Sequence, residues 1–278
     1  MAETSQYEKY EELVGTPWWY YVISLYLISN FKESCIFLPV EIEDGNQLVG
    51  EVFSLGWFCG KEKCTLVPPT VLCKSTKCEK IDASNIEEGF ENFKNYIQNC
   101  VTGSHRLAVI PLSLRMAGAG GHSNMLIYDK TLHTLERYEP NGADTVEMFN
   151  PYLLDGTVSV WFKENLDSEI TYIAPFEYCP NIGPQKLEEQ TRVDVHFKRG
   201  LCSLWSFLYT LLRLSKPDMS RETINKFMQR QVEKQGFKFL IGVLTKMVSF
   251  SDKLMVAESK QDIEVVMEEM SRSKFQWS

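Results

Sequence analysis

Two strand-like runs joined by a short polar turn constrain the fold of this chain more than any other feature. Residues 123–128 and 132–138 are rich in aliphatic and aromatic side chains, and the polar tripeptide at 129–131 lies between them. Apolar runs of this length on either side of a short polar break are typical of two antiparallel strands. The sequence therefore predicts a β-hairpin at the middle of the chain.

The register of this hairpin determines which polar side chains meet. With the turn centred at residues 130–131, His122 faces Glu139 and Asn124 faces Arg137. Directly opposed residues have Cβ atoms roughly 4.5–5.5 Å apart. A carboxylate opposite an imidazole can fix its tautomer, orient the ring and stabilise the imidazolium. The hairpin thus predicts a histidine–carboxylate pair.

The remaining periodicities predict an α+β fold with a central, mainly antiparallel sheet and helices packed around it. Helices are expected within 8–30, over 86–100 and 202–214, and from Ser220 onward, and further strands at 35–41, 106–114, 156–162 and 170–176. The helix after Gly200 should stop at Lys216-Pro217-Asp218, because proline ends a helix.

We divide the 278 residues into three parts. Residues 1–100 are a mixed accessory region with a cysteine-rich segment at 57–82, residues 101–218 are a catalytic core, and residues 219–278 are a helical region.

Composition excludes several classes of protein. The net charge is −8 and the basic residues are scattered, so we expect no nucleic-acid partner. The start of the chain has no secretory signal, and the most apolar stretch, 18–28, is about half the ~20 residues that cross a bilayer. Eight cysteines are too few for a disulfide scaffold, so they should be reduced thiols in the cytosol.

Four of the cysteines form two closely spaced pairs, Cys59 with Cys64 and Cys73 with Cys78, with Pro68-Pro69 between them. Two thiolate pairs on adjacent turns can close a tetrahedral zinc site, although this spacing is at the loose end of the range. The alternative is a hairpin with partly buried thiols. The sequence therefore allows both a structural zinc site and a hairpin with buried thiols.

The residue that most suggests chemistry is Cys202, which begins the apolar helix. Unpaired amides and the positive end of the helix dipole favour a thiolate there. His122 can activate the thiol as a base or ion-pair partner, and Gln185, in a loop marked by Gly183-Pro184, can donate to an oxyanion. Each residue alone also has a structural interpretation, as core, turn or solvated strand end, but their order together favours a site.

The order His122, Glu139, Gln185, Cys202 resembles the peptidase group of adenovirus adenain and the ubiquitin-like-protein-specific proteases, within the papain-like cysteine peptidases. The stretches 121–129 and 135–142 look more particularly like uncharacterised proteins of large cytoplasmic DNA viruses, and the resemblance covers roughly 106–218. It implies an adenain-like cysteine protease fold.

By this resemblance His122 is the base, Glu139 its orienter, Gln185 the oxyanion donor and Cys202 the nucleophile. Two departures concern the neighbours of these residues. Ser123 stands where those proteases usually have tryptophan, and the nucleophile follows the glutamine at a longer distance than usual. Either residues 186–199 form an excursion, or Gln190 is the donor.

The resemblance implies a thiol peptidase or isopeptidase that cleaves a viral precursor or a ubiquitin-like modifier, with a protein substrate and no required cofactor. An acyltransferase that uses the same cysteine, histidine and glutamate is the first alternative, and a non-catalytic binding or virion protein that retains the fold is the second. The expected location is the host cytoplasm or the virion.

Overall fold

The computed structural model describes residues 2–36, 40–43, 47–52, 55–59, 62–67, 71–74, 77–80, 94–95, 97–116, 120–143, 149–191 and 201–275. The helices are α1 (Ala2–Leu13), α2 (Pro17–Asn30), α4 (Pro151–Asn165), α5 (Pro175–Tyr178), α6 (Pro184–Thr191), α7 (Cys202–Ser215), α8 (Arg221–Gln235), α9 (Lys238–Met255) and α10 (Lys260–Arg272). The strands are β1 (Ser34–Ile36), β2 (Val40–Glu43), β3 (Gln47–Val52), β4 (Leu55–Cys59), β5 (Cys64–Val67), β6 (Val71–Lys74), β7 (Lys77–Lys80), β8 (Leu107–Met116), β9 (Gly120–Asp129), β10 (Thr134–Tyr138) and β11 (Thr171–Ile173). Residues 94–95 and 97–102 are also helical, within the helix predicted at 86–100.

The central sheet has seven strands in the order β11-β10-β9-β8-β4-β5, and β1 also pairs with β8. The predicted α+β class is confirmed, but the sheet is mixed. Strands β1 and β4 both pair with β8 in parallel, and β10 pairs with β11 in parallel. Helix α4 lies between β10 and β11 in the chain, and a crossover of this kind returns the chain in the same direction. Strands β2, β3, β6 and β7 form a second, antiparallel sheet.

The predicted hairpin is β9 and β10, but its register differs from the expected one. Asp129 pairs with Thr134, so residues 130–133 form a longer turn than predicted. The carboxylate of Asp129 accepts the backbone N–H groups of Thr131 and Leu132 and thereby stabilises this turn. The pairing shifts by two residues, so the side chains predicted to share a face of the sheet still do so.

The strand predicted at 156–162 is wrong, because these residues lie within α4. Asn150 accepts the backbone N–H of Leu153 at 3.2 Å, and Pro151 occupies the first turn, which together favour a helix start. Buried Leu154, Val158 and Phe162 recur at helical spacing. The run predicted at 170–176 is a strand only over β11 and continues into α5.

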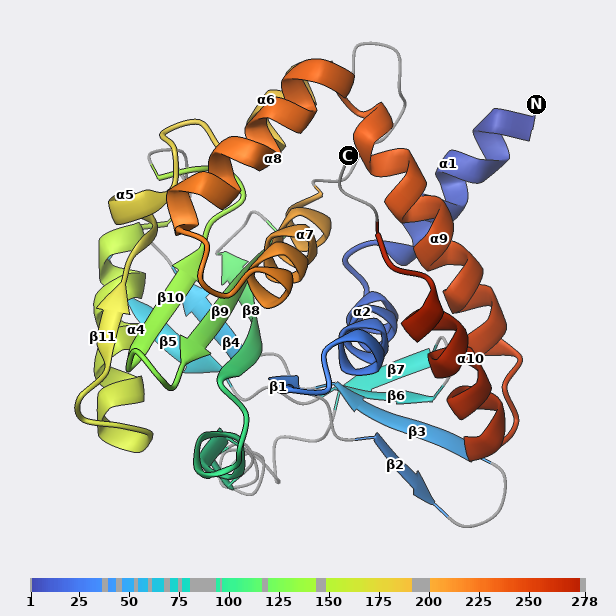
Figure 1. Cartoon of the computed structure of the whole chain (residues 1–278), viewed down its shortest axis with the longest axis horizontal. Helices are drawn as coiled ribbons and strands as arrows, with labels where there is room; N and C mark the ends of the chain where they lie inside the picture. The colour runs from blue at the N-terminus through green and yellow to red at the C-terminus, as the bar shows by residue number, and fades with distance from the viewer. Residues whose placement is uncertain are drawn as a thin grey trace.

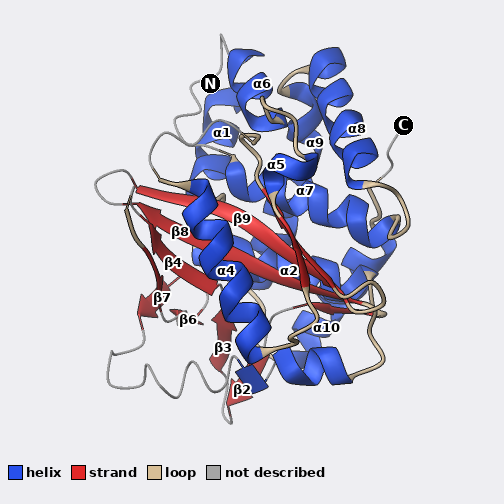
Figure 2. Ribbon diagram, turned by 90° about the vertical axis from the view of Figure 1, so that its left-hand side faces the viewer, coloured by secondary structure: helices blue, strands red, loops and turns tan. Residues whose placement is uncertain are grey.

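Helices cover both faces of the central sheet (Figures 1 and 2). Alternate residues of β9 divide between the two cores: Met125 and Ile127 pack with α2 and α7, whereas Leu126 and Tyr128 pack with α4. The core that contains α2 and α7 draws side chains from all three predicted parts of the chain, and their division stays a prediction. Among the described helices, none combines the length and apolarity needed to cross a membrane.

Candidate active site

His122 and Glu139 meet at the end of the β9–β10 hairpin. Both side chains are buried, and Nε2 of His122 lies 2.7 Å from Oε1 of Glu139. Glu139 follows the last residue of β10 and reaches His122 diagonally, because the register places it beside Asn124. The predicted pair is thus present, although the two residues are not directly opposed.

Cys202 begins α7, which packs against β9, and its side chain is half-buried. Cys202 lies close enough to His122 for its thiol to interact with the imidazole, and this interaction contributes to the raised pKa of His122. Since Nε2 of the imidazole binds Glu139, Nδ1 is the nitrogen left for the thiol. The structure therefore brings the three residues His122, Glu139 and Cys202 together in the order thiol, imidazole, carboxylate.

The electrostatics of the pair favour an imidazolium–carboxylate state. Burial by itself would lower the pKa of His122, but the Glu139 carboxylate and the hydrogen bonds to Cys202 and Glu139 raise that pKa to about 10. Burial would raise the pKa of Glu139, but His122 and Arg137 together lower it below its usual range. His122 is consequently protonated at neutral pH, and an imidazolium is the partner that stabilises a thiolate.

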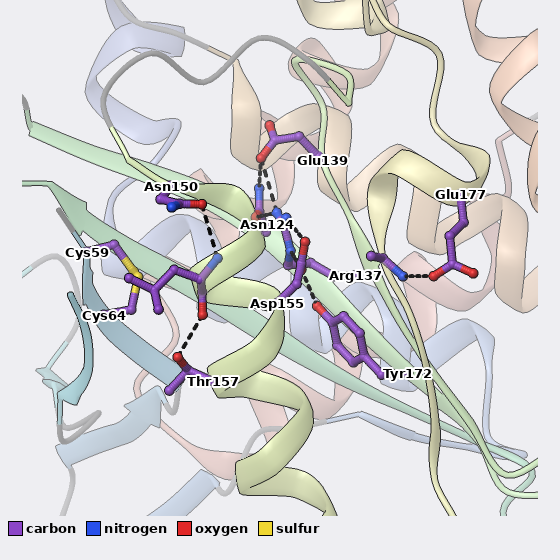
Figure 3. A network of polar contacts seen from close by, with 12 residues as sticks. Cys59, Cys64, Asn124, Arg137, Glu139, Asn150, Asp155, Thr157, Tyr172 and Glu177 are labelled. Carbon is purple, nitrogen blue, oxygen red and sulfur yellow. Dashed lines mark hydrogen bonds and ion pairs between the residues drawn. A yellow bond between two sulfur atoms is a disulfide. The ribbon is translucent and has the colours of Figure 1, made fainter. Parts of the chain in front are cut away.

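A buried polar network, which the sequence analysis missed, holds Glu139 in place. Asn124 donates to Oε2 of Glu139 at 3.1 Å and accepts from Nη1 of Arg137 at 2.7 Å. Arg137 also binds the Asp155 carboxylate of α4 through two nitrogens, at 2.6 and 3.0 Å (Figure 3). Tyr172 of β11 donates to Asp155 at 2.6 Å. The alternation of polar residues in β9 and β10 is visible in the sequence, but the sequence does not indicate that Asp155 of α4 pairs with Arg137.

The opposite face of β9 ties two helices to the residue after His122. The Tyr20 hydroxyl of α2 donates to Oγ of Ser123 at 2.6 Å, and Ser206 of α7 donates to the Ser123 carbonyl at 3.2 Å. Burial and the nearby Cys202 raise the pKa of Tyr20, so its hydroxyl stays protonated and can donate. These bonds fix α7, and with it Cys202, relative to the strand that carries His122.

The segment after Glu139 docks closely onto the start of α6. Gly183 N–H donates to the Asn141 carbonyl at 2.8 Å, and Gln185 N–H donates to the Pro140 carbonyl at 3.1 Å. A Cβ on Gly142, whose φ is +98°, would lie 2.4 Å from the backbone of Gly183. Glycine at 142 and 183 therefore permits this approach.

Gln185 lies in the first turn of α6 and is buried, whereas Gln190 on the same helix is exposed. The Gln185 side-chain nitrogen donates to Glu189 at 2.9 Å, and its carbonyl oxygen has no hydrogen-bond partner among the described residues. The role of Gln185 as an oxyanion donor stays a prediction. Backbone amides offer a second source: among the described residues no side chain caps the start of α7, and the first N–H groups of a helix have no partner within the helix itself.

The cysteines differ from the prediction of free thiols. Cys35 and Cys100 form one disulfide, and Cys59 and Cys64, which face each other across β4 and β5, form another. The fold brings Cys35 of β1 to the helical turn at Cys100, which the sequence spacing does not indicate. The side chains of the second predicted zinc pair, at 73 and 78 on β6 and β7, lie outside the described residues. A disulfide cannot bind zinc, so the four-cysteine site requires the reduced protein and stays a prediction.

Comparisons with known proteins find one viral relative. No family model matches the chain. It is 31% identical over 172 residues to the ankyrin repeat protein L371 of Acanthamoeba polyphaga mimivirus, a match that spans 56% of this chain. The chain covers only 22% of the length of that protein.

Two crystal structures of the Legionella pneumophila effector protein RavZ are similar at a low level. Their TM-scores are 0.36 and 0.35, at 9% and 11% sequence identity. The matches cover 94% and 90% of this chain, and 70% and 66% of the RavZ chains. Scores this low do not establish a common fold, and the adenain-like fold implied by the sequence is not confirmed.

Proposed function

We propose that this protein is a cysteine hydrolase that cleaves a peptide or isopeptide bond in a protein substrate, with Cys202 as nucleophile and His122 as base. The observation that carries the proposal is the buried imidazole between the Glu139 carboxylate and the Cys202 thiol. A nucleophile within reach of a base, which is itself oriented by a third group, is the arrangement that acyl transfer requires.

In the first half-reaction the Cys202 thiolate attacks the carbonyl carbon of the scissile bond. The C–N bond breaks as His122 gives its proton to the departing amine, and a thioester with Cys202 forms. Glu139 stabilises the imidazolium before this step and holds the ring at Nε2 throughout. Backbone N–H groups at the start of α7 can donate hydrogen bonds to the developing oxyanion, and Gln185 is the candidate side-chain donor.

Water completes the cycle. After the amine leaves, neutral His122 takes a proton from a water molecule, and the resulting hydroxide attacks the thioester carbonyl carbon. The C–S bond breaks, the product carboxylic acid departs, and the thiolate–imidazolium pair is restored. The protein residues supply every proton transfer, so this reaction needs no cofactor.

As substrates we propose a viral precursor protein or a conjugate of a ubiquitin-like modifier, encountered in the host cytoplasm. The viral relative supports a viral setting, and the resemblance of the His122, Glu139 and Cys202 order to proteases of ubiquitin-like proteins supports the modifier. Each substrate presents a carbonyl carbon to the same thiol, so the chemistry of the site does not distinguish the two substrates.

Activity-based labelling tests the nucleophile and the substrate class together. The full chain is treated with vinyl-sulfone probes of ubiquitin and its relatives, and with iodoacetamide near neutral pH, and the modified cysteine is located by mass spectrometry. We expect modification at Cys202 that is lost in Cys202→Ala and slowed by at least about 10²-fold in His122→Ala. Labelling by one modifier probe would identify the modifier, whereas iodoacetamide labelling alone would favour a viral precursor.

Cys179 is the matched control, because it is also a free cysteine but is buried, and burial raises its pKa to about 12. Cys179→Ala should label like the wild type. Equal iodoacetamide rates at Cys202 and Cys179, or a Cys202 rate that His122→Ala leaves unchanged, would contradict the proposal and favour a non-catalytic binding protein.

A further inference from the structure

A hollow of about 410 Å³ lies at the opposite end of α7 from Cys202, between that helix and α8. Leu212 lines it and is the tenth residue after the nucleophile, which corresponds to about 15 Å along the helix axis. Its volume is within the range of ligand sites, which is roughly 300–1,000 Å³. The hollow is therefore distinct from the proposed catalytic site.

The floor of the hollow is apolar and its rim is cationic. Leu212 and Ile224 are buried beneath it, and the partly exposed Phe227 and Met219 line it as well. The exposed cations Lys216, Lys226 and Arg230 surround these side chains, and none of the described residues that line the hollow is acidic.

The positive charge around this hollow contrasts with the net negative charge of the chain. The chain has 37 acidic and 29 basic residues, yet the described residues that line this hollow include three cations and no carboxylate. None of the three cations forms an ion pair with a described residue, although Glu222 lies one turn before Lys226 on α8. A local cationic rim on an acidic protein selects an anionic partner.

The rim is held in place by buried contacts. Arg213, which the buried Glu136 carboxylate binds, donates to the Pro217 carbonyl at 2.8 Å and to the Met219 carbonyl at 3.4 Å. Ser220 caps α8 by accepting the Thr223 N–H. The turn between α7 and α8 is thus anchored, and a preformed site costs little ordering free energy on binding.

We propose that this hollow, formed by the end of α7 and the start of α8, binds a peptide segment of a partner protein that presents a bulky apolar side chain flanked by acidic residues. The apolar side chain enters the hollow over Ile224 and Phe227, and carboxylates of the peptide pair with the rim. Binding at this place does not depend on the proposed hydrolase activity.

The spacing of the cations favours a peptide over a single phosphate or fatty-acid headgroup. Lys226 and Arg230 are four residues apart on α8, so their Cα atoms are separated by about 6 Å along the axis. Lys216 belongs to a different element, at the end of α7. Cations spread in this way match carboxylates distributed along a chain, whereas a single headgroup requires cations that converge on one point.

The test is selection from a library of random peptides displayed on phage. The target is the 278-residue chain with Cys202→Ala, and the same chain that also carries Lys226→Glu and Arg230→Glu is the counter-selection. We expect enriched peptides that combine a large apolar residue with neighbouring Asp or Glu. A synthetic peptide of that consensus should bind at least about tenfold more weakly to the double variant, and more weakly to the unmodified target as salt rises.

The matched control is Lys163→Glu with Lys260→Glu, which changes the net charge equally at exposed lysines elsewhere, on α4 and α10. It should bind the peptide like the unmodified target. Phe227→Ala should weaken binding without removing its salt dependence, and circular dichroism verifies that each variant is folded. No enrichment, enriched peptides without acidic residues, or equal loss of binding in both double variants would overturn the proposal.

Discussion

Two buried glutamates of the same strand region have opposite surroundings. Glu136 projects from one face of β10 toward α7, where Arg213 and Arg221 bind its carboxylate and Tyr209 donates to it at 2.9 Å. Glu139 lies on the other face and accepts from Arg137 as well, but its shortest contact is with His122. Arginine cannot give up its proton in a protein, whereas histidine can. Burial of a carboxylate therefore indicates only that it is paired, and the chemistry of the partner decides whether the pair can serve catalysis.

The largest expected effect is a difference in kcat/KM between variants of two histidines. His122→Ala should lower kcat/KM by at least about 10⁴-fold, because both the base and the thiolate partner are lost. His133 makes a similar contact, with Nδ1 2.8 Å from the Asp167 carboxylate, but it is exposed in the hairpin turn. His133→Ala should leave kcat/KM within about twofold of the wild type. A large loss in both variants would show that the assay reports folding rather than chemistry.

Glu136→Ala should lower the free energy of unfolding more than Glu139→Ala does. Glu136→Ala leaves the buried Arg213 without its carboxylate, and we expect a loss of about 3–5 kcal/mol in the free energy of unfolding. Glu139→Ala should cost less, because Arg137 keeps its ion pair with Asp155. Urea denaturation followed by circular dichroism measures both values. Equal losses of unfolding free energy in the two variants would mean that the Glu136 and Glu139 networks stabilise the fold equally.

Glu139→Gln should reduce the rate while Glu136→Gln leaves it nearly unchanged. The neutral amide cannot stabilise the imidazolium, so we expect kcat to fall by about 10²–10³-fold in Glu139→Gln. Steady-state kinetics on the identified substrate, corrected for the folded fraction, measures the two rates. A similar fall in Glu136→Gln would mean that the α7 face also contributes to catalysis.

The pH dependence of stability should distinguish His122 from the arginine pairs. The pKa of His122 is raised from 6.5 to about 10, so its contribution is fully present below pH 6.5 and is lost as pH rises through 10. The stability difference between the wild type and His122→Gln should therefore shrink by on the order of 2 kcal/mol from pH 6 to pH 10. Glu139 has a lowered pKa, so its contribution is lost only in acid. Thermal unfolding across this pH range provides the measurement, and a constant difference would contradict the assignment.

The smallest expected effect concerns the hydrogen bonds behind the site. Tyr20→Phe removes the donor to Ser123 and should cost about 1 kcal/mol of stability. We expect a several-fold fall in kcat with little change in KM, because Cys202 is positioned less precisely. Tyr21→Phe is the control, since Tyr21 is a neighbouring buried tyrosine of α2. Parallel losses in both variants would indicate a general packing effect.

Local sequence signals predicted the elements that carry the catalytic candidates. The apolar run after Gly200 predicted α7 with Cys202 at its first position, and the helix predicted from Ser220 onward begins as α8. The same approach failed for α4, where the alternation around Val158 resembled a strand and the Asn150-Pro151 start signal was overlooked.

The sequence by itself determined that His122 and Glu139 share one face of a hairpin, because strand side chains alternate with a period of two and a shift by two residues preserves the face. Only the tertiary structure decided that the pair is diagonal, that Asp155 holds Arg137, and that Cys202 reaches His122. Each of these contacts joins elements that are distant in the chain. Periodicity and capping report the conformation of neighbouring residues, whereas such contacts depend on how whole helices pack against the sheet.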